Sequence, residues 1–452
     1  MHQRPAHFAC RVGFVLLCVL PTAAVAGWIV QRSLPAYTLS AKQEWEQELS
    51  RQLGLRVTCS SVSYPRPDTA ELSSVALADP ETGAPIASAS TLEVIREADR
   101  WKLVGSQVVV ESNQWPLLKD QFEQRWLRRA DSAAGDQIPC EIWFREITFQ
   151  AVERSLTLVD VAGVWKAAAD GPSCTLTFRL PEADPQAKPA QMTVQRNRQT
   201  SPPTTHWQLA TGSSAIPCSL VAPAWPMLTQ LGSGAEFSGQ LDVVQSGEDT
   251  GGRLQGTLNR LDLDALVSEQ FAQQLSGHAV CQIEDAVLER GRLRLVRGTL
   301  KCRDGWIGRS LLTAASEHLQ LACPPPDALG SGLAPVSFRQ LSLGFELQDD
   351  SLRLTGSADP LREHVLIATA SGSLLEASPQ HRAASWGLLR ALAPQSELPV
   401  PAARQAQALA RLLPAPDNAS AATVARRSSH VPTRLQPSRD SQQPPVRQPQ
   451  LR

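Results

Sequence analysis

Hydrophobic and polar residues alternate along most of the chain after residue 54. The clearest example is Leu55, Val57 and Cys59, each of which is followed by a polar residue. Runs with the same period recur up to residue 375, and short turns such as Asp79–Gly83 separate them. A period of two places successive side chains on opposite faces of a β-strand. The pattern therefore predicts a mainly β fold in which consecutive strands form an antiparallel meander.

Two segments break this alternation with helical spacing. We predict helices near residues 40–53 and 116–129, whose apolar residues recur every fourth position. Their apolar faces are formed by Trp45, Leu49 and Leu53 in the first helix, and by Leu118, Phe122 and Trp126 in the second. The polar face of the first helix is net acidic, whereas anionic lipid surfaces attract basic faces. We therefore expect the first helix to close one end of the β-rich region.

Residues 12–30 form an apolar stretch without a charged residue. A bilayer core of ~30 Å needs a helix of about 20 apolar residues, so the stretch is just long enough to be a transmembrane anchor. Arg4 and Arg11 favour a short basic cytoplasmic end over residues 1–11 and a body carried across the membrane. The alternative is a signal peptide cleaved after Ala26, because small residues stand at the required positions. Both interpretations export the body.

Prolines and glycines divide that body into two parts. We expect a first β-rich groove region over 31–215 and a second β-rich region over 236–375, joined by a Pro/Gly-rich linker at 216–235. Residues 262–275 have the spacing of a helix inserted between strands of the second region. Short helices are predicted over 383–413.

Charge separates the end of the chain from the rest. Residues 414–452 contain six arginines, two aspartates and no aromatic residue, which predicts a disordered basic tail. Such a tail suits an acidic polymer or lipid headgroups, and the alternative is a solvated tail without a specific partner. The whole chain has a formal net charge of -1, so no global basic field attracts nucleic acid.

Seven of the nine cysteines lie in the body. An odd number leaves at least one thiol unpaired or paired between chains. Cys281 and Cys302 are spaced for a cross-strand disulfide, and the alternative is that the body cysteines are small buried hydrophobic residues. No Cys and His residues stand at the spacing of a metal site.

Motifs that carry chemistry are missing from the sequence. None of the eight histidines forms a zinc-protease motif, and no nucleophile elbow or phosphate-binding glycine loop occurs. Arg362, Glu363 and His364 form the only local cation, acid and base trio, which we interpret as a turn. Asp262 and Asp264 could ligate a hard cation, but Asp264 at the start of the predicted helix is interpreted as its cap. We expect no catalytic residue, no cofactor and no metal site.

Several short motifs at the start of the body match the pattern of one family. They are Gly54–Val57, Ser63–Pro67, Val75–Pro80, Glu81–Gly83 and Leu92–Val94. Preceded by a single apolar N-terminal helix, they resemble the start of an AsmA-like protein of the AsmA/TamB group. The resemblance covers residues 10–110, with a looser match over 236–375.

The resemblance implies an elongated, taco-shaped β-groove in the periplasm behind one inner-membrane helix. It also implies a non-enzymatic protein that holds or transfers lipid or supports envelope biogenesis. The expected partners are the inner membrane, phospholipid acyl chains and envelope proteins, with no nucleic acid. The alternative function is an envelope scaffold whose solid sheets bind a protein partner through a sheet edge or the basic tail. If the signal peptide is cleaved, the protein is secreted to the periplasm instead.

Overall fold

A computed structural model describes the body of the chain between residues 35 and 414, with gaps, and two residues before it. The described residues are 21–22, 35–128, 139–150, 155–166, 168, 170–221, 230–247, 249–324, 334–359, 362, 364–393 and 404–414. This part is mainly β: a mixed, largely antiparallel sheet of 21 strands with six α-helices. The predicted fold class is confirmed at this level.

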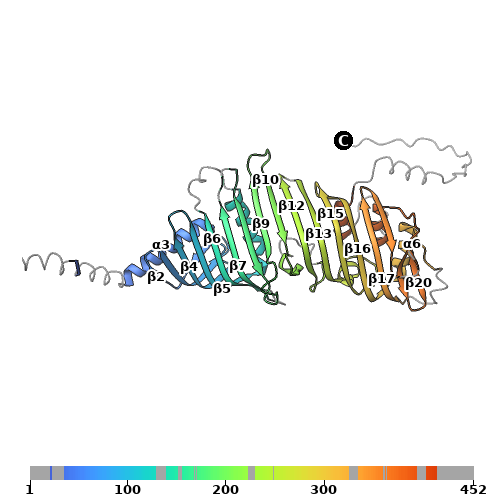
Figure 1. Cartoon of the computed structure of the whole chain (residues 1–452), viewed down its shortest axis with the longest axis horizontal. Coiled ribbons are helices and arrows are strands. Elements are labelled where there is room, and N and C mark those ends of the chain that lie inside the picture. Colours follow the sequence, from blue (N-terminus) through green and yellow to red (C-terminus); the bar gives the residue numbers. More distant parts are fainter. Residues whose placement is uncertain are drawn as a thin grey trace, which may run out of the picture. The chain divides into compact units, whose positions relative to one another are not determined.

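Strands β1 and β2 both pair with β3, and from β3 to β10 the strands follow one another through the sheet in chain order (Figure 1). These first strands are β1 (Arg56–Thr58), β2 (Ser61–Arg66), β3 (Thr69–Ala78), β4 (Pro85–Arg96), β5 (Trp101–Glu111), β6 (Cys140–Gln150), β7 (Leu156–Lys166), β8 (Ser173–Arg179), β9 (Ala190–Asn197) and β10 (Thr204–Ala210).

The later strands continue the same sheet. They are β11 (Ile216–Pro217), β12 (Glu236–Ser246), β13 (Asp249–Asp262), β14 (Leu275–Ser276), β15 (His278–Glu289), β16 (Arg292–Ile307), β17 (Val336–Gln348), β18 (Ser351–Gly356), β19 (Val365–Thr369), β20 (Gly372–Glu376) and β21 (Ala383–Ala384).

Strands β5 and β6 form the parallel pair of the sheet, and all other described pairings are antiparallel. A parallel neighbour needs a crossover connection. That connection contains α4 (Trp115–Gln121) and a π-helix, η3 (Phe122–Leu127). The helix predicted near 116–129 is therefore present, but its second half is a π-helix, and its last residue lies outside the described part.

The predicted linker at 216–235 does not interrupt the sheet. Strand β10 pairs with β12 over seven residues, from Thr204 opposite Ser246 to Ala210 opposite Gln240. The chain between them forms β11 and the short helix α5 (Cys218–Val221) before it returns. Hydrogen bonding thus runs through both β-rich regions.

Helix α3 (Pro35–Leu53) covers the first edge of the sheet, where the sequence predicted a closing helix. Trp45 and Leu49 are buried against β1, β2 and β3. The Val57 amide donates a hydrogen bond to Ser50 Oγ at 2.9 Å. The Cys59 amide donates to Glu46 Oε1 at 2.9 Å. These bonds occupy edge amides that would otherwise be open to a further strand.

Helices at the other end of the sheet pack on β13 to β18. They are α6 (Arg309–Leu319), α7 (Ser385–Leu392) and α8 (Arg404–Leu412). The last two lie within the region predicted to form short helices. Helix α6 was not predicted, although Leu311, Ala315 and Leu319 recur every fourth position and are buried.

The prediction of a helix over 262–275 is wrong. Strand β13 runs on to Asp262, and only a π-helical turn, η6 (Asp264–Ser268), follows before β14. Leu261 pairs with Ala279 of β15, and Leu263 and Val267 are buried in the core. Tertiary packing of these side chains therefore overrides the local helical spacing.

Three glycines stand in one line across β12, β13 and β16. Gly239 lies opposite Gly256. Gly256 and Gly298 both lie opposite Ile283 of β15, on its two sides. A Cβ on Gly256 would lie 2.3 Å from Ser238 O, and one on Gly298 would lie 2.3 Å from Gln282 O. Only glycine permits such a close approach of neighbouring backbones, which is one way in which sheets bend.

Two predicted segments fall mostly outside the described residues. The apolar stretch at 12–30 is described only at Pro21 and Thr22, which are helical, and the tail is described only at Pro414. Among the residues that the structure describes, none of the helices combines the length and hydrophobicity needed to cross a bilayer.

Candidate ligand-binding cavity

One face of the sheet carries an unbroken line of apolar positions. Directly opposite residues of paired strands project from the same face. Followed from pair to pair, the register connects positions that are apolar in fourteen strands, from β3 to β18. This apolar row consists of Ala70, Val94, Leu103, Ile142, Gly163, Leu176, Met192, Leu209, Leu241, Leu254, Ala286, Val296, Leu347 and Leu352.

Burial differs along the apolar row. At the first end, Val94 is fully buried beneath the cluster that includes α3. At the last end, Leu347 and Leu352 are buried in the cluster that includes α6, α7 and α8. The residues between, from Leu176 to Leu254, are only half-buried. The helices therefore cover the two ends of the apolar row more completely than its middle.

The opposite face of the same strands is polar. One line of opposed positions reads Thr175, Thr193, Gln208, Asp242 and Arg253. Gln208 Nε2 donates a hydrogen bond to Asp242 Oδ2 at 3.1 Å. The contrast between the faces is the outcome expected from a period of two.

A cavity of about 330 Å³ lies on the apolar face beside the first end of the sheet. Helix α3 contributes Leu49 and Leu53, and the crossover contributes Phe122 and Trp126. The bend before β1 contributes Leu55, and α4 adds Leu118 and Gln121. The strands contribute Val57, Val75, Leu77, Ala87, Ser88, Ala89, Leu92, Leu103, Val108, Cys140, Ile142, Phe144, Val164, Trp165 and Cys174. Ser88 and Gln121 are the polar exceptions in this lining. The volume lies at the lower end of the ~300–1,000 Å³ found for small-molecule sites.

Aromatic rings close the side of the cavity nearest the middle of the sheet. The π-helix η3 presents Phe122 and Trp126, four residues apart, from one face. The Trp126 ring centre lies 5.2 Å from that of Trp165 in an edge-to-face arrangement. Phe122 contacts Trp165 at 6.0 Å and Trp207 of β10 at 6.4 Å. The crossover thus connects the cavity wall to the half-buried middle of the sheet.

Cysteines are part of this apolar surface. Cys140 and Cys174 line the cavity, and all seven body thiols are free in the structure. Burial raises the pKa of five of them to about 11, which keeps them protonated at neutral pH. These five are Cys140, Cys174, Cys218, Cys281 and Cys302.

Cys281 and Cys302 are not directly opposite each other on β15 and β16. Cys281 pairs with Leu300, and Cys302 pairs with Ala279. The two thiols are therefore displaced diagonally between β15 and β16, and both belong to the buried core. The structure agrees with the interpretation of these residues as small buried hydrophobic side chains.

The polar groups that the sequence singled out do not form a reaction centre. The Arg362 amide donates to Asp359 O at 3.3 Å, as in a turn, and Glu363 lies outside the described residues. Asp262 Oδ1 accepts hydrogen bonds from the amides of Asp264 and Ala265, and the N-cap residue of η6 is Leu263, so Asp264 is not the cap that the sequence predicted. Within the described ranges, no group of three His, Cys, Asp or Glu side chains could hold a metal ion.

Sequence reasoning identified several cavity residues as strand or helix faces, but not the cavity itself. Alternation placed Leu55 and Val57 on one face, and helical spacing placed Leu49 with Leu53 on one helix and Phe122 on the apolar face of another. Their meeting depends on the crossover between β5 and β6, for which the sequence contains no local signal.

Comparisons of the chain with protein-family models, curated proteins and solved structures found no match.

Proposed function

We propose that this protein is a non-enzymatic, membrane-anchored envelope protein that holds or transfers lipid along the apolar face of its sheet. The acyl chain enters the cavity beside α3 and the crossover and continues over the half-buried middle of the apolar row. The predicted segment at 12–30 anchors the chain in the inner membrane, with the body in the periplasm. The resemblance to AsmA-like proteins supports the same role.

The observation that carries this proposal is the continuity of the apolar row. A single apolar cavity is compatible with an ordinary packing defect, but fourteen opposed apolar positions in succession form a path. Its middle, including Leu209 and Leu241, is only half-buried. Each methylene group that leaves water for such a surface contributes ~0.8 kcal/mol. A long alkyl chain therefore has enough apolar contact to bind without a charged anchor.

The second candidate is a scaffold that recruits a protein partner through a sheet edge. Addition of a strand beside β1 is disfavoured, because Ser50 and Glu46 of α3 already accept hydrogen bonds from the amides of Val57 and Cys59. We therefore rank the scaffold below the lipid-binding role.

A fluorescent fatty acid tests the proposal on the full chain. Leu103→Trp would fill the cavity, whereas Val104→Trp adds the same ring to the opposite face of β5. We expect Leu103→Trp to weaken probe binding about tenfold or more, equivalent to ~1.4 kcal/mol, and Val104→Trp to leave it nearly unchanged. Equal binding by both variants and the wild type would overturn the proposed site.

A further inference from the structure

An arginine is held between two tryptophan rings where β4 ends. The Arg96 Cζ atom lies 4.5 Å from the ring centre of Trp45 and 5.0 Å from that of Trp101. Trp45 comes from α3, and Trp101 stands directly opposite Arg96 on β5. Trp45 Nε1 donates a hydrogen bond to Tyr64 Oη at 2.9 Å, which fixes the indole. The guanidinium carbon lies over both rings while the side chain stays exposed, and a guanidinium that stacks on aromatic rings can still donate its N–H groups to a ligand.

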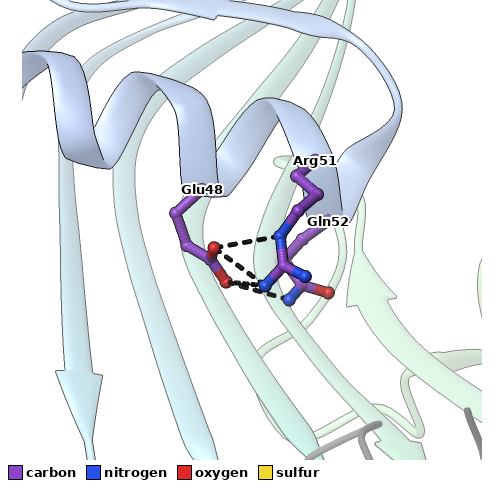
Figure 2. A network of polar contacts seen from close by, with 3 residues as sticks. All are labelled: Glu48, Arg51 and Gln52. Carbon is purple, nitrogen blue, oxygen red and sulfur yellow. Dashed lines mark hydrogen bonds and ion pairs between the residues drawn. The ribbon is translucent and has the colours of Figure 1, made fainter.

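This stack lines a surface pocket of about 860 Å³. Most charges in and around the pocket neutralise one another. Arg51 and Gln52 both bind Glu48, as Figure 2 shows, and these bonds lower the pKa of Glu48, with Arg51 the main cause. Arg100 binds Glu97 at 2.6 Å and also binds Glu141.

Three charged groups of the pocket remain outside these pairs. Among the described residues, no ion pair involves Arg96, Glu44 or Asp68. Asp68 accepts a hydrogen bond from Thr69 Oγ1, which does not neutralise its charge. The pocket therefore presents one cation and two carboxylates that form no ion pair, and Arg96 also makes a small contribution to the lowered pKa of Glu48.

The pocket and the apolar cavity share no lining residue, but neighbouring residues of the same elements line the two. On α3, Trp45 lines the pocket, and Leu49, one turn later, lines the cavity. On β5, Trp101 and Leu103 are two residues apart on one face. Trp101 lines the pocket, and Leu103 lines the cavity. All four side chains belong to a single hydrophobic cluster. A molecule with a polar head and an apolar chain matches this arrangement of a charged pocket beside an apolar cavity.

We propose that the pocket binds the zwitterionic phosphoamine head of a phospholipid whose acyl chain lies in the cavity. The phosphate accepts hydrogen bonds from the N–H edge of Arg96, as guanidinium groups bind phosphate in two-pronged geometry. The ammonium group lies beside Glu44 and Asp68. An anionic head without an amine is disfavoured, because it would face two uncompensated carboxylates. This inference rests on the proposed function and adds a head-group preference to it.

Binding of single-chain lipids of equal acyl length to the full chain distinguishes the head-group site from the apolar cavity. The probes are lysophosphatidylethanolamine, lysophosphatidylglycerol and a monoacylglycerol, with glycerophosphoethanolamine as the head without a chain. We expect the phosphoethanolamine lipid to bind about tenfold more tightly than either other lipid, and the free head to bind weakly. Equal binding of the three lipids by the wild type would overturn the head-group site. Tight binding of the free head would show a phosphate site that needs no lipid, and would also overturn it.

Arg96→Gln should abolish the preference for phosphoethanolamine and leave monoacylglycerol binding unchanged. Lys102→Gln is the matched control, because it removes one positive charge next to Trp101, at a side chain that lies over Trp143 instead. A preference that survives Arg96→Gln would overturn the inference. If Leu103→Trp no longer binds monoacylglycerol, the cavity is supported whether or not the head-group site exists. Failure of the head-group site is therefore distinguishable from failure of the proposed function.

A second variant leaves Arg96 in place and changes the two carboxylates instead. Glu44 and Asp68 are exposed, so Glu44→Gln combined with Asp68→Asn should leave the fold intact. We expect this double variant to lose the discrimination between phosphoethanolamine and phosphoglycerol lipids. Unchanged discrimination would contradict the assignment of the ammonium group to these carboxylates.

Discussion

Leu209 of β10 stands directly opposite Leu241 of β12, although β11 and α5 intervene in the chain. The two strands pair in register over seven residues, so the apolar row crosses this junction without a gap. A shift by one residue would have placed a polar side chain in the row. The apolar face is therefore continuous between the two β-rich regions, although residues 216–235 come between them in the chain.

A charge at this junction should obstruct lipid movement. We expect Leu241→Asp to reduce transfer of a fluorescent phospholipid between vesicles about tenfold, because an ionised carboxylate in an apolar path is costly to dehydrate. Gln240→Asp is the matched control, since it places the same charge on the other face of β12. The thermal unfolding of both variants verifies folding. Transfer that is equally fast in Leu241→Asp and Gln240→Asp would contradict a path along the apolar row.

The glycine line should be sensitive to a single methyl group. Gly298→Ala is expected to lower the free energy of unfolding by about 1–3 kcal/mol, because its Cβ would overlap Gln282 O. Gly251→Ala serves as control in β13, where the nearest atom to an added Cβ is Leu288 O at 3.4 Å. Urea unfolding of the two variants measures the difference. Similar stabilities would show that close backbone approach at Gly298 is unimportant.

His381 connects the last strands to α6. Its Nδ1 accepts a hydrogen bond from the Leu354 amide at 3.1 Å, and its Nε2 lies 2.5 Å from Leu319 O. Since the side chain is buried, His381→Ala leaves two backbone groups without partners at ~1–3 kcal/mol each. His381→Gln can restore the bond to Leu319 and should be less destabilising. Chemical unfolding measures both variants, and equal losses would argue against the two hydrogen bonds.

The buried thiols predict a pH dependence of stability. Cys140, Cys174, Cys218, Cys281 and Cys302 each have a pKa of about 11, whereas an unfolded cysteine titrates near 8.5. The unfolded chain therefore releases these protons first, and the free energy of unfolding should fall as pH rises from about 8.5 to about 11. Urea midpoints across this range measure the effect. A variant with all five cysteines replaced by alanine should lose that part of the slope.

Reactivity provides an independent measurement of the same thiols. At pH 8, roughly one such thiol in a thousand is ionised, and only the thiolate is a nucleophile. We expect iodoacetamide to modify the native protein slowly and the urea-unfolded protein rapidly, with Cys140 and Cys174 among the slowly modified sites. Rapid modification of these two residues in the native protein would contradict the burial of their thiols in the lining of the apolar cavity.

Local patterns in the sequence were sufficient for the mainly β character of the fold and for the first helix. Leu55, Val57 and Cys59 are buried and the residues between them are exposed, as alternation predicted. The face of α3 with Trp45 and Leu49 also follows from spacing alone. These features depend on residues close together in the chain, where side-chain direction is set by the backbone period.

Long-range pairing accounts for what the sequence did not predict. The apolar row requires the register of every strand pair, and register is a property of two segments rather than one. The cavity requires the parallel crossover that brings Phe122 over Trp165. At Leu261, pairing with β15 and burial in the core extend the strand where local spacing favoured a helix. The pocket at Arg96 joins α3 to β5 and has no local signature.

Native mass spectrometry of the full chain, purified without added lipid, tests the central claim most directly. The wild type and Val104→Trp should carry a bound species of phospholipid mass, and Leu103→Trp should carry much less of it. Lipid extraction from the same samples would identify the bound species. A wild type that is free of lipid, or a Leu103→Trp variant that retains the wild-type amount, would contradict an acyl chain in the cavity beside α3.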